Sequence, residues 1–404
     1  MIRRALLCGL CVLGGALTLV AADAPLRVFL LDPARMAAVR ARVAAGDADL
    51  RPALAALDRD AAAALTAGPF SVTTKTVVPP SGDKHDYMSQ APYFWPDPSK
   101  GDGRPYVRRD GERNPEIDRI TDHREMDRMV SAVETLATAY YLRRDDRLAA
   151  RAAALLRAWF IDPATRMNPN QRFGQGIPGI TDGRGIGLIE TRGFTRVVDA
   201  IGLLSGSRAW TETDDRGVRE WFQAFLAWMR ESRNGTDEAA AKNNHGTYYD
   251  LQVASYALFL GRDDLAREIL QAARGKRIAV QIEPDGRQPL ELARTKGWSY
   301  SVGNLDGLTL LATLGDRVGV DLWNYETPDG RGIRKALDFL VPFGLGDRKW
   351  PYQQIGDWPS GILSPVIRRA ARHYRDPRFQ DVVARLPGLA ATDRARLTHA
   401  TASD

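Results

Sequence analysis

Residues 242–261 read KNNHGTYYDLQVASYALFLG, and this stretch decides how the rest of the chain is interpreted. The part from 247 to 260 carries apolar residues at helical spacing and predicts a core helix. The part before it places two amides and an imidazole at the start of that helix. An asparagine or threonine here would cap the helix, and Gly246 would permit a tight entry. Such a histidine lies at the positive end of the helix dipole, which favours the neutral ring. The pattern is therefore compatible with a cap and with a functional site.

Helical periodicity dominates on both sides of this stretch. The segment 214–232 is the clearest case, because its apolar residues fall on one side of a helix, namely Val218, Trp221, Phe222, Phe225 and Met229. Further helices are expected within 33–66 and at 124–143, 146–160, 187–205, 247–260, 263–280, 304–315, 331–343 and 361–374. Alternation typical of strands is nearly absent, and RVFLL at 27–31 is the one short candidate.

Three long connections interrupt the helices at 70–120, 162–186 and 283–303. Long irregular connections in a helical protein are usually functional. We therefore expect an all-α fold, an incomplete α/α toroid of helical hairpins whose long loops form a cleft. No repeat of fixed period is visible.

The composition is that of a globular protein, with 44% hydrophobic and 26% charged residues in a chain of 404. The net charge of +6 is mild, and no basic run or nucleic-acid motif accompanies it. Nucleic acid is therefore not expected as a partner, whereas an anionic polymer is compatible with the charge. The sequence leaves the oligomeric state open.

Residues 1–24 predict a secretory signal peptide, because two arginines precede an apolar run that ends in small residues. Cleavage after Ala22 or Ala24 would leave residues 25–404 as a single domain. Both cysteines, Cys8 and Cys11, would be removed. We expect a periplasmic or secreted protein without stable membrane insertion after cleavage.

A second candidate stretch is ELARTKGWSYSVGNLDGL at 291–308. Arg294, Lys296, Trp298 and Tyr300 lie in a glycine-containing connection and not on an apolar stripe. The charges would suit a solvated face and the tyrosine would suit a core. An arginine beside a tyrosine would alternatively stabilise the phenolate, which matters because a free phenol has a pKa of about 10.

A third candidate is the proline-rich segment 83–116, DKHDYMSQAPYFWPDPSKGDGRPYVRRDGERNPE. Its prolines exclude a helix, and it is dense in tyrosine and tryptophan. Aromatic faces in an irregular loop suit stacking against sugar rings, with basic side chains nearby for acidic groups. A rigid surface loop is the alternative interpretation.

These three candidates, HDYMSQAPYFWPDP (85–98), KNNHGTYYD (242–250) and ELARTKGWSYSVGNL (291–305), resemble in this order the alginate lyase superfamily of polysaccharide lyases. The resemblance covers roughly residues 70 to 345. It implies an α/α toroid that cleaves polyuronates by β-elimination without a cofactor.

Carried over by position, the family's catalytic residues correspond to four residues here: Asn244, His245, Arg294 and Tyr300. β-Elimination needs donors that neutralise the uronate carboxylate, a base for the C5 proton and an acid for the departing oxygen. Asn244 and Arg294 are donors of this kind, and Tyr300 and His245 are candidates for the base and the acid. We expect syn elimination with Tyr300 acting as base and then acid, on mannuronate-rich alginate or glucuronan.

Other polar and aromatic residues are predicted to bind the substrate, most of them in the three stretches and two in the segments 170–185 and 189–201. They are Lys84, His85, Tyr87, Ser89, Tyr93, Trp95, Gln175, Arg192, Tyr248 and Trp298. No metal site is expected, since no His-x-x-x-His or cysteine spacing occurs.

Two rival functions remain open at this point. A glycoside hydrolase would need two opposed carboxylates, for instance Asp86 with Asp250 or Glu291. A non-catalytic protein that binds acidic oligosaccharides would keep the aromatic loop, but it has no reason to hold an arginine, a tyrosine and a histidine together.

Overall fold

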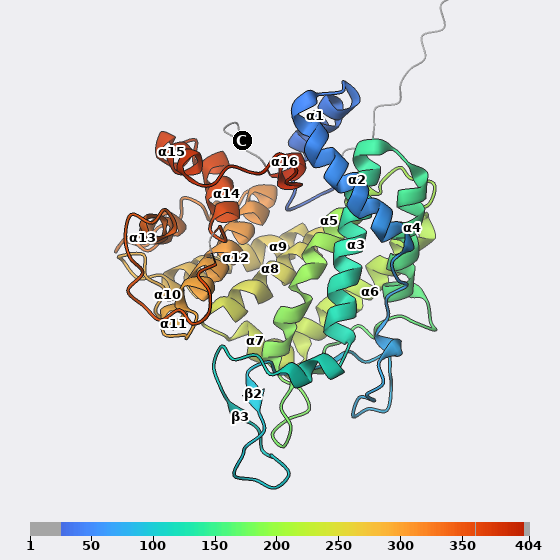
Figure 1. The fold of residues 1–404 in the computed structure, drawn as a ribbon, viewed down its shortest axis with the longest axis vertical. Helices are drawn as coiled ribbons and strands as arrows, with labels where there is room; N and C mark the ends of the chain where they lie inside the picture. Colours follow the sequence, from blue (N-terminus) through green and yellow to red (C-terminus); the bar gives the residue numbers. More distant parts are fainter. Residues whose placement is uncertain (1–25, 360, 400–404) are drawn as a thin grey trace, which may run out of the picture.

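The computed structural model describes residues 26–359 and 361–399, and the predicted signal peptide lies outside them. Five helices follow one another in an arc, each packed on the next (Figure 1). They are α3 (Asp122–Arg143), α5 (Phe194–Leu203), α8 (Asn244–Phe259), α12 (Gly297–Val318) and α14 (Ser364–Tyr374). This arc forms the inner layer of the molecule.

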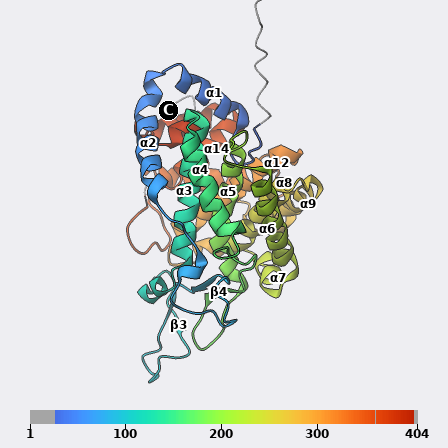
Figure 2. The same ribbon diagram turned by 90° about the vertical axis from the view of Figure 1, so that its right-hand side faces the viewer.

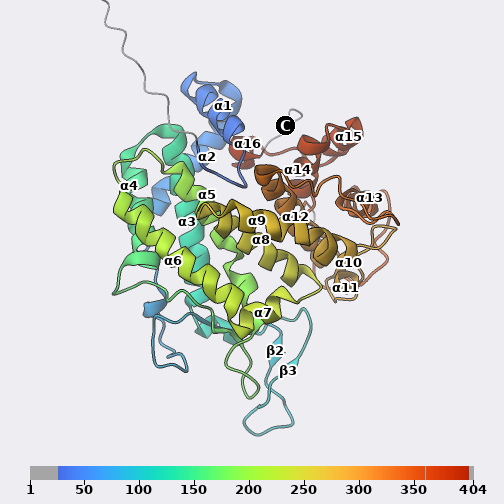
Figure 3. The same ribbon diagram turned by 180° about the vertical axis from the view of Figure 1, so that it is seen from behind.

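A second set of helices packs on the outside of the arc. It comprises α4 (Asp146–Leu156), α6 (Glu212–Glu231), α9 (Asp263–Ala273), α13 (Ile333–Gly344) and α15 (Pro377–Arg385). Figure 3 shows α6 and α9 on the side of the molecule opposite to the view of Figure 1. The predicted all-α toroid of helical hairpins is thus confirmed.

The two ends of the described chain meet across the arc. The N-terminal helices α1 (Pro33–Ala44) and α2 (Arg51–Thr66) both contact the short C-terminal helix α16 (Ala395–Thr398), and α2 also packs on α3. One hydrophobic cluster contains residues from Val28 to Leu397. None of the helices between residues 26 and 399 has the length and apolarity that crossing a bilayer requires.

The core follows the apolar stripe predicted for 214–232. All five apolar residues named for that segment are buried in α6. Trp221 and Phe225 stack with their ring centroids 5.0 Å apart, and Phe160 and Phe194 pack edge-on against Trp221. Burial of these aromatic side chains dominates the packing between the two layers on this side.

Residues 27–31 do not form the strand that their sequence suggested. The backbone N–H groups of Phe29, Leu30 and Leu31 instead donate to the carboxylate of Asp199, at 2.6, 2.9 and 2.7 Å. Burial raises the pKa of Asp199 to about 6, against the effect of these three hydrogen bonds. Residues 29–31 bend around this carboxylate, so a buried side chain, and not a neighbouring strand, satisfies their backbone N–H groups.

The long connections gather at one end of the helices, as predicted, and they contain short strands (Figures 1 and 2). In one pair, β1 (Met88–Gln90) lies parallel to β4 (Phe173–Gly176). In the other, β2 (Phe94–Trp95) lies antiparallel to β3 (Val107–Arg108). Three small helices lie near this end, α7 (Arg233–Ala239), α10 (Ala279–Gln281) and α11 (Pro289–Leu292).

The start of α12 differs from the prediction. The helix begins at Gly297, whereas the sequence pattern indicated a connection up to residue 303. Backbone bonds to a later loop fix this start, because Gly297 N–H donates to the Gln353 carbonyl and Ile355 N–H to the Thr295 carbonyl. Tyr300 therefore projects from the first turn of a helix.

Candidate active site

The start of α8 is built around a close backbone approach. Asn243 caps the helix, its side chain accepting the N–H of His245 at 3.3 Å. A Cβ atom at Gly246 would lie 2.1 Å from the Ala241 carbonyl oxygen and 2.3 Å from the Arg277 guanidinium. Only glycine fits there, as the sequence indicated. The tight entry places Asn244 and His245 in the first turn.

Asn244 is held by a buried carboxylate on α11. Its backbone N–H and its side-chain Nδ2 both donate to Glu291, at 2.7 Å and at 2.8–2.9 Å. Glu291 is 1% exposed. Burial raises its pKa, although the hydrogen bonds from Asn244 and the charges of Arg294 and His245 oppose the rise.

His245 is held in the same manner from α7. Its Nδ1 lies 2.8 Å from Oε1 of Glu238, whose side chain is 1% exposed. A carboxylate only accepts hydrogen bonds, so Nδ1 carries a proton. Nε2 is the ring nitrogen that does not bind Glu238. The second carboxylate oxygen of Glu238 has no hydrogen-bond partner among the described residues. Glu238 thus fixes the tautomer of His245.

Arg294 and Tyr300 form the second half of the site. Nη2 of Arg294 donates to the Tyr300 hydroxyl at 2.9 Å, and this hydroxyl donates to the Tyr93 hydroxyl at 3.0 Å. Arg294 also forms an ion pair with Asp110, with Nη2 to Oδ1 at 2.7 Å. Asp110 follows β3, so the hairpin of the proline-rich segment reaches over this pair.

Arg294 lowers the pKa of Tyr300, as expected, but other effects outweigh it. Burial and the hydrogen bond with Tyr93 raise the pKa of the phenol well above its usual value, and the guanidinium opposes them only in part. Asp110 contributes to the rise, because its negative charge disfavours a negative charge on the phenol. The hydroxyl is therefore protonated in the unliganded site.

A buried polar network holds the starts of α8 and α12 together. Nδ2 of Asn304 donates to the side-chain oxygens of Gln281 and Gln288, both at 2.8 Å. The Thr247 hydroxyl lies 2.8 Å from Asn304 Oδ1, which joins α8 to the same network. The helices α8 and α12 are thus joined, and Glu291, which holds Asn244, precedes Arg294 by three residues.

The predicted substrate-binding residues fall into several groups. Tyr93 contacts Tyr300 directly. Trp95 donates its Nε1–H to the Glu112 carbonyl at 3.0 Å, and Arg109 lies 5.1 Å from its ring centroid. Both aromatic side chains are partly exposed on the hairpin segment.

Three predicted binding residues are almost fully buried and fix other groups. The hydroxyls of Tyr87 and Ser89 donate to one oxygen of Glu190, at 2.8 and 2.6 Å. Gln175 has a positive φ of 49° and accepts from Arg184 at 2.9 Å. These contacts order the β1–β4 region beneath the hairpin.

Lys84, His85 and Trp298 lie elsewhere than the sequence suggested. Lys84 is exposed, and His85 bonds through Nδ1 to the Arg166 carbonyl at 2.6 Å, so neither contacts the other predicted residues. Trp298 is 1% exposed beneath Trp350 and Trp358. Its indole is a core side chain that no sugar reaches, because it is buried. Trp298 belongs to α12 and not to the predicted connection.

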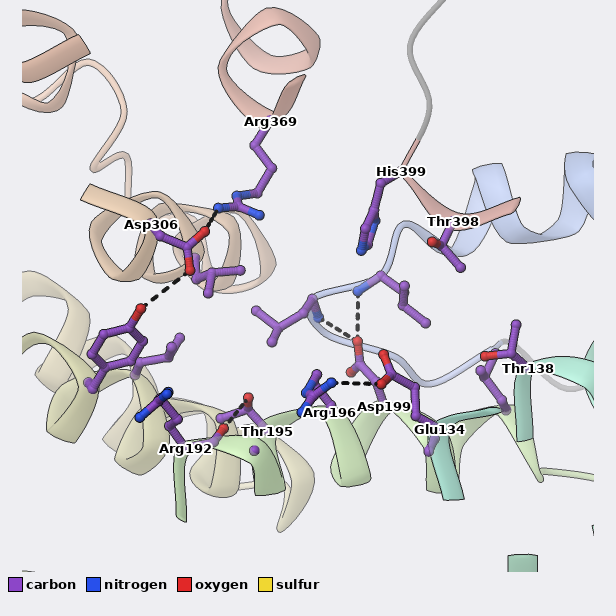
Figure 4. Close-up of a pocket in the computed structure, with 18 of the residues that line it drawn as sticks. Glu134, Thr138, Arg192, Thr195, Arg196, Asp199, Asp306, Arg369, Thr398 and His399 are labelled. Carbon is purple, nitrogen blue, oxygen red and sulfur yellow. Dashed lines mark hydrogen bonds and ion pairs between the residues drawn. The ribbon is translucent and has the colours of Figure 1, made fainter. Parts of the chain in front are cut away.

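Arg192 and Tyr248 line a partly open cavity of about 370 Å³, which the close-up in Figure 4 shows. The four predicted catalytic residues are not among its lining residues. Arg192 lies over the Tyr248 ring, 5.6 Å from the centroid, and the Tyr248 hydroxyl donates to the Gly303 carbonyl at 2.9 Å.

Sequence reasoning missed the carboxylates that orient the site. Asp110 and Glu238 carried no signal that distinguishes them from the other acids, and the helix that carries Glu238 was not predicted. Glu291 was considered only as a hydrolase acid. Within the described residues, no group of three or more His, Cys, Asp or Glu side chains could hold a metal ion.

The acids that a hydrolase would need are occupied. Asp250 is buried in an ion pair with Arg277, and Asp86 accepts from the amides of Asn168 and Asn170. Glu291 binds Asn244. These three carboxylates serve separate structural contacts.

Comparison with known proteins identifies the family. The family model described as alginate lyase matches residues 71–350. The crystal structure of an alginate lyase from Bacteroides ovatus is 40% identical, with a TM-score of 0.89, over 92% of this chain and 99% of that chain. No curated protein sequence matches.

Two further structures share the fold at 16% identity. Alginate lyase A1-III from Sphingomonas species A1 aligns with a TM-score of 0.59 over 94% of this chain and 97% of its own. A histidine-to-alanine variant of A1-III complexed with a tetrasaccharide aligns with a TM-score of 0.61, over 95% and 98%. Fold and site together define the class, an α/α-toroid polysaccharide lyase. More particularly, the chain belongs to the alginate lyase family.

Proposed function

We propose that the protein cleaves mannuronate-rich alginate or glucuronan by syn β-elimination, with Tyr300 as base and then as acid. The observation that supports this best is the hydrogen-bonded set of Arg294, Tyr300 and Tyr93 beside the first turn of α8. An arginine and a phenol in contact, next to an amide and an imidazole, are what elimination from a uronate requires.

The carboxylate of the uronate must first be neutralised, because removal of the C5 proton adds negative charge to it. Asn244 and Arg294 are proposed to donate to this carboxylate. Tyr300 first releases its hydroxyl proton to solvent, because the phenol is protonated in the unliganded site. The resulting phenolate takes the C5 proton, and the C5–H electron pair forms the C4–C5 double bond. The C4–O bond breaks, and Tyr300 returns the proton to the departing oxygen. Atoms balance without water.

Stereochemistry divides the roles of Tyr300 and His245. In mannuronate and glucuronate, the C5 proton and the C4 oxygen lie on one ring face, so a single group serves both. In guluronate they lie on opposite faces, and two groups are needed. We propose that Nε2 of His245, the ring nitrogen that is not bound to Glu238, is the base in that case.

The test is incubation with polymannuronate, glucuronan, polyguluronate and a neutral glycan, with ultraviolet absorbance reporting the new double bond. Absorbance growth on the first two substrates is expected. Reducing ends without absorbance would indicate a hydrolase, and binding without either product would indicate a non-catalytic protein. Either outcome contradicts the proposal.

We further propose that the protein is exported to the periplasm or secreted. This rests on the layout of residues 1–24, with arginines, an apolar run and small residues. Mass spectrometry of the N-terminus after expression in a secreting host tests it. A mature chain that retains Met1 would contradict it.

A further inference from the structure

The cavity is joined to the candidate active site through α8 and α12. Tyr248 follows His245 by three residues on α8, and its hydroxyl meets the Gly303 carbonyl, three residues after Tyr300 on α12. Residues three apart share a helix face and are separated by about 4.5 Å along the axis. Tyr248, which lines the cavity, therefore lies one helical turn along α8 from the proposed catalytic His245.

Most charges that line the cavity are already paired. Arg196 forms an ion pair with Glu134 at 2.9 Å, and Arg369 pairs with Asp306, which also accepts the Tyr248 hydroxyl at 3.3 Å (Figure 4). Two further lining carboxylates also have partners. Glu190 accepts the hydroxyls of Tyr87 and Ser89, and Asp127 lies 3.5 Å from His123.

Arg192 differs from these arginines. Its side chain is exposed to the cavity, donates to the Ile189 carbonyl at 3.2 Å and lies over the Tyr248 ring. No ion pair with a carboxylate is among its contacts within the described chain. A guanidinium has five N–H donors in a fork that matches a carboxylate, so most of them remain available to a ligand.

The rest of the lining suits the body of a sugar. Leucines at 30, 203, 251 and 310 contribute apolar wall, and the hydroxyls of Thr138 and Thr398 are polar points within it. The volume of about 370 Å³ lies at the lower end of the ~300–1,000 Å³ found for small-molecule sites. The space fits a short piece of a chain and not a long one.

We infer that this cavity is a binding subsite for an acidic sugar unit of the substrate, with Arg192 binding that unit's carboxylate and the Tyr248 edge supporting its ring. The inference rests on the proposed function, because it places the unit next to the one that is cleaved.

Binding to a Tyr300→Phe variant tests the inference without turnover. Titration calorimetry with a saturated mannuronate tetramer is compared between this variant and the same variant carrying Arg192→Ala. We expect affinity to fall about tenfold, as for loss of a charge-assisted contact, with Arg192→Lys retaining part of it. A neutral mannose tetramer should show no dependence on Arg192.

Arg230→Ala is the matched control, since it removes the same charge from an exposed position on α6. Unchanged tetramer affinity in the Arg192→Ala variant, or an equal loss in the control, would overturn the inference. A thermal melt of each variant excludes unfolding as the cause. If the wild type forms no double bond but Arg192-dependent binding persists, the proposed function fails while the subsite stands.

Discussion

The first turns of α8 and α12 both carry proposed catalytic groups, yet the carboxylates that hold them differ in burial. Glu238 and Glu291, which hold His245 and Asn244, are each 1% exposed. Asp110, which holds Arg294, is 20% exposed and comes from the hairpin segment. The buried core thus fixes the positions of Asn244 and His245, which form the α8 half of the site. The protonation of Tyr300, in the α12 half, depends on a surface loop.

The largest effect is expected from Tyr300→Phe, which breaks the α12 half. Loss of the proposed base and acid should lower kcat by about 10³-fold on polymannuronate, in the range of general acid–base contributions. Tyr93→Phe, which keeps the Tyr300 hydroxyl, is the matched control and should lose far less. Comparable losses in both variants would argue that the phenol pair acts only structurally.

His245→Ala tests the α8 half and should act on one substrate. We expect about 10²-fold lower activity on polyguluronate, because the proposed base is lost, and little change on polymannuronate. Rates of double-bond formation on the two polymers measure the split. Equal loss on both would count against separate roles for His245 and Tyr300.

Glu291→Ala tests whether the α8 half depends on burial. The change leaves the backbone N–H and amide of Asn244 without their acceptor in the core. An unsatisfied buried donor costs about 1–3 kcal/mol in the free energy of unfolding, to be measured by urea denaturation. Glu268→Ala, on the exposed face of α9, should be nearly neutral, and similar costs for the two would refute this role of Glu291.

Asp110→Asn should have the smallest effect, a shift of the pH profile. Asp110 contributes to the raised pKa of Tyr300, and the proposed base is the phenolate. The phenolate fraction grows as pH rises towards that pKa, so kcat/KM should increase with pH in the wild type. Removing the negative charge lowers the pKa of Tyr300 and moves this increase to lower pH.

A variant that disturbs the same contact without removing a charge separates electrostatics from geometry. Thr295→Val deletes a hydroxyl that bonds Asp110 at 3.0 Å. Its pH profile should keep the wild-type position. A profile that moves in Thr295→Val but not in Asp110→Asn would show that loop geometry governs the change.

Much of the fold was predictable because apolar stripes such as that of α6 report burial directly. The four proposed catalytic residues were predicted from the resemblance of three motifs in order, and their roles stay a prediction. Their supports were not, since burial of Glu238 or Glu291 is a property of distant packing. Trp298 was misplaced for a related reason: bonds from residues 353–355 start α12 earlier than its own sequence indicates.

The lining of the cavity contains residues from both ends of the described chain, Leu30 from one and Thr398 and His399 from the other. A chain that stops short of α16 would still contain every proposed catalytic residue. It would nevertheless lack two side chains that line the proposed subsite, so its affinity for short uronate oligomers should differ. Oligomer affinity is therefore a readout of whether the last turn of the protein is in place.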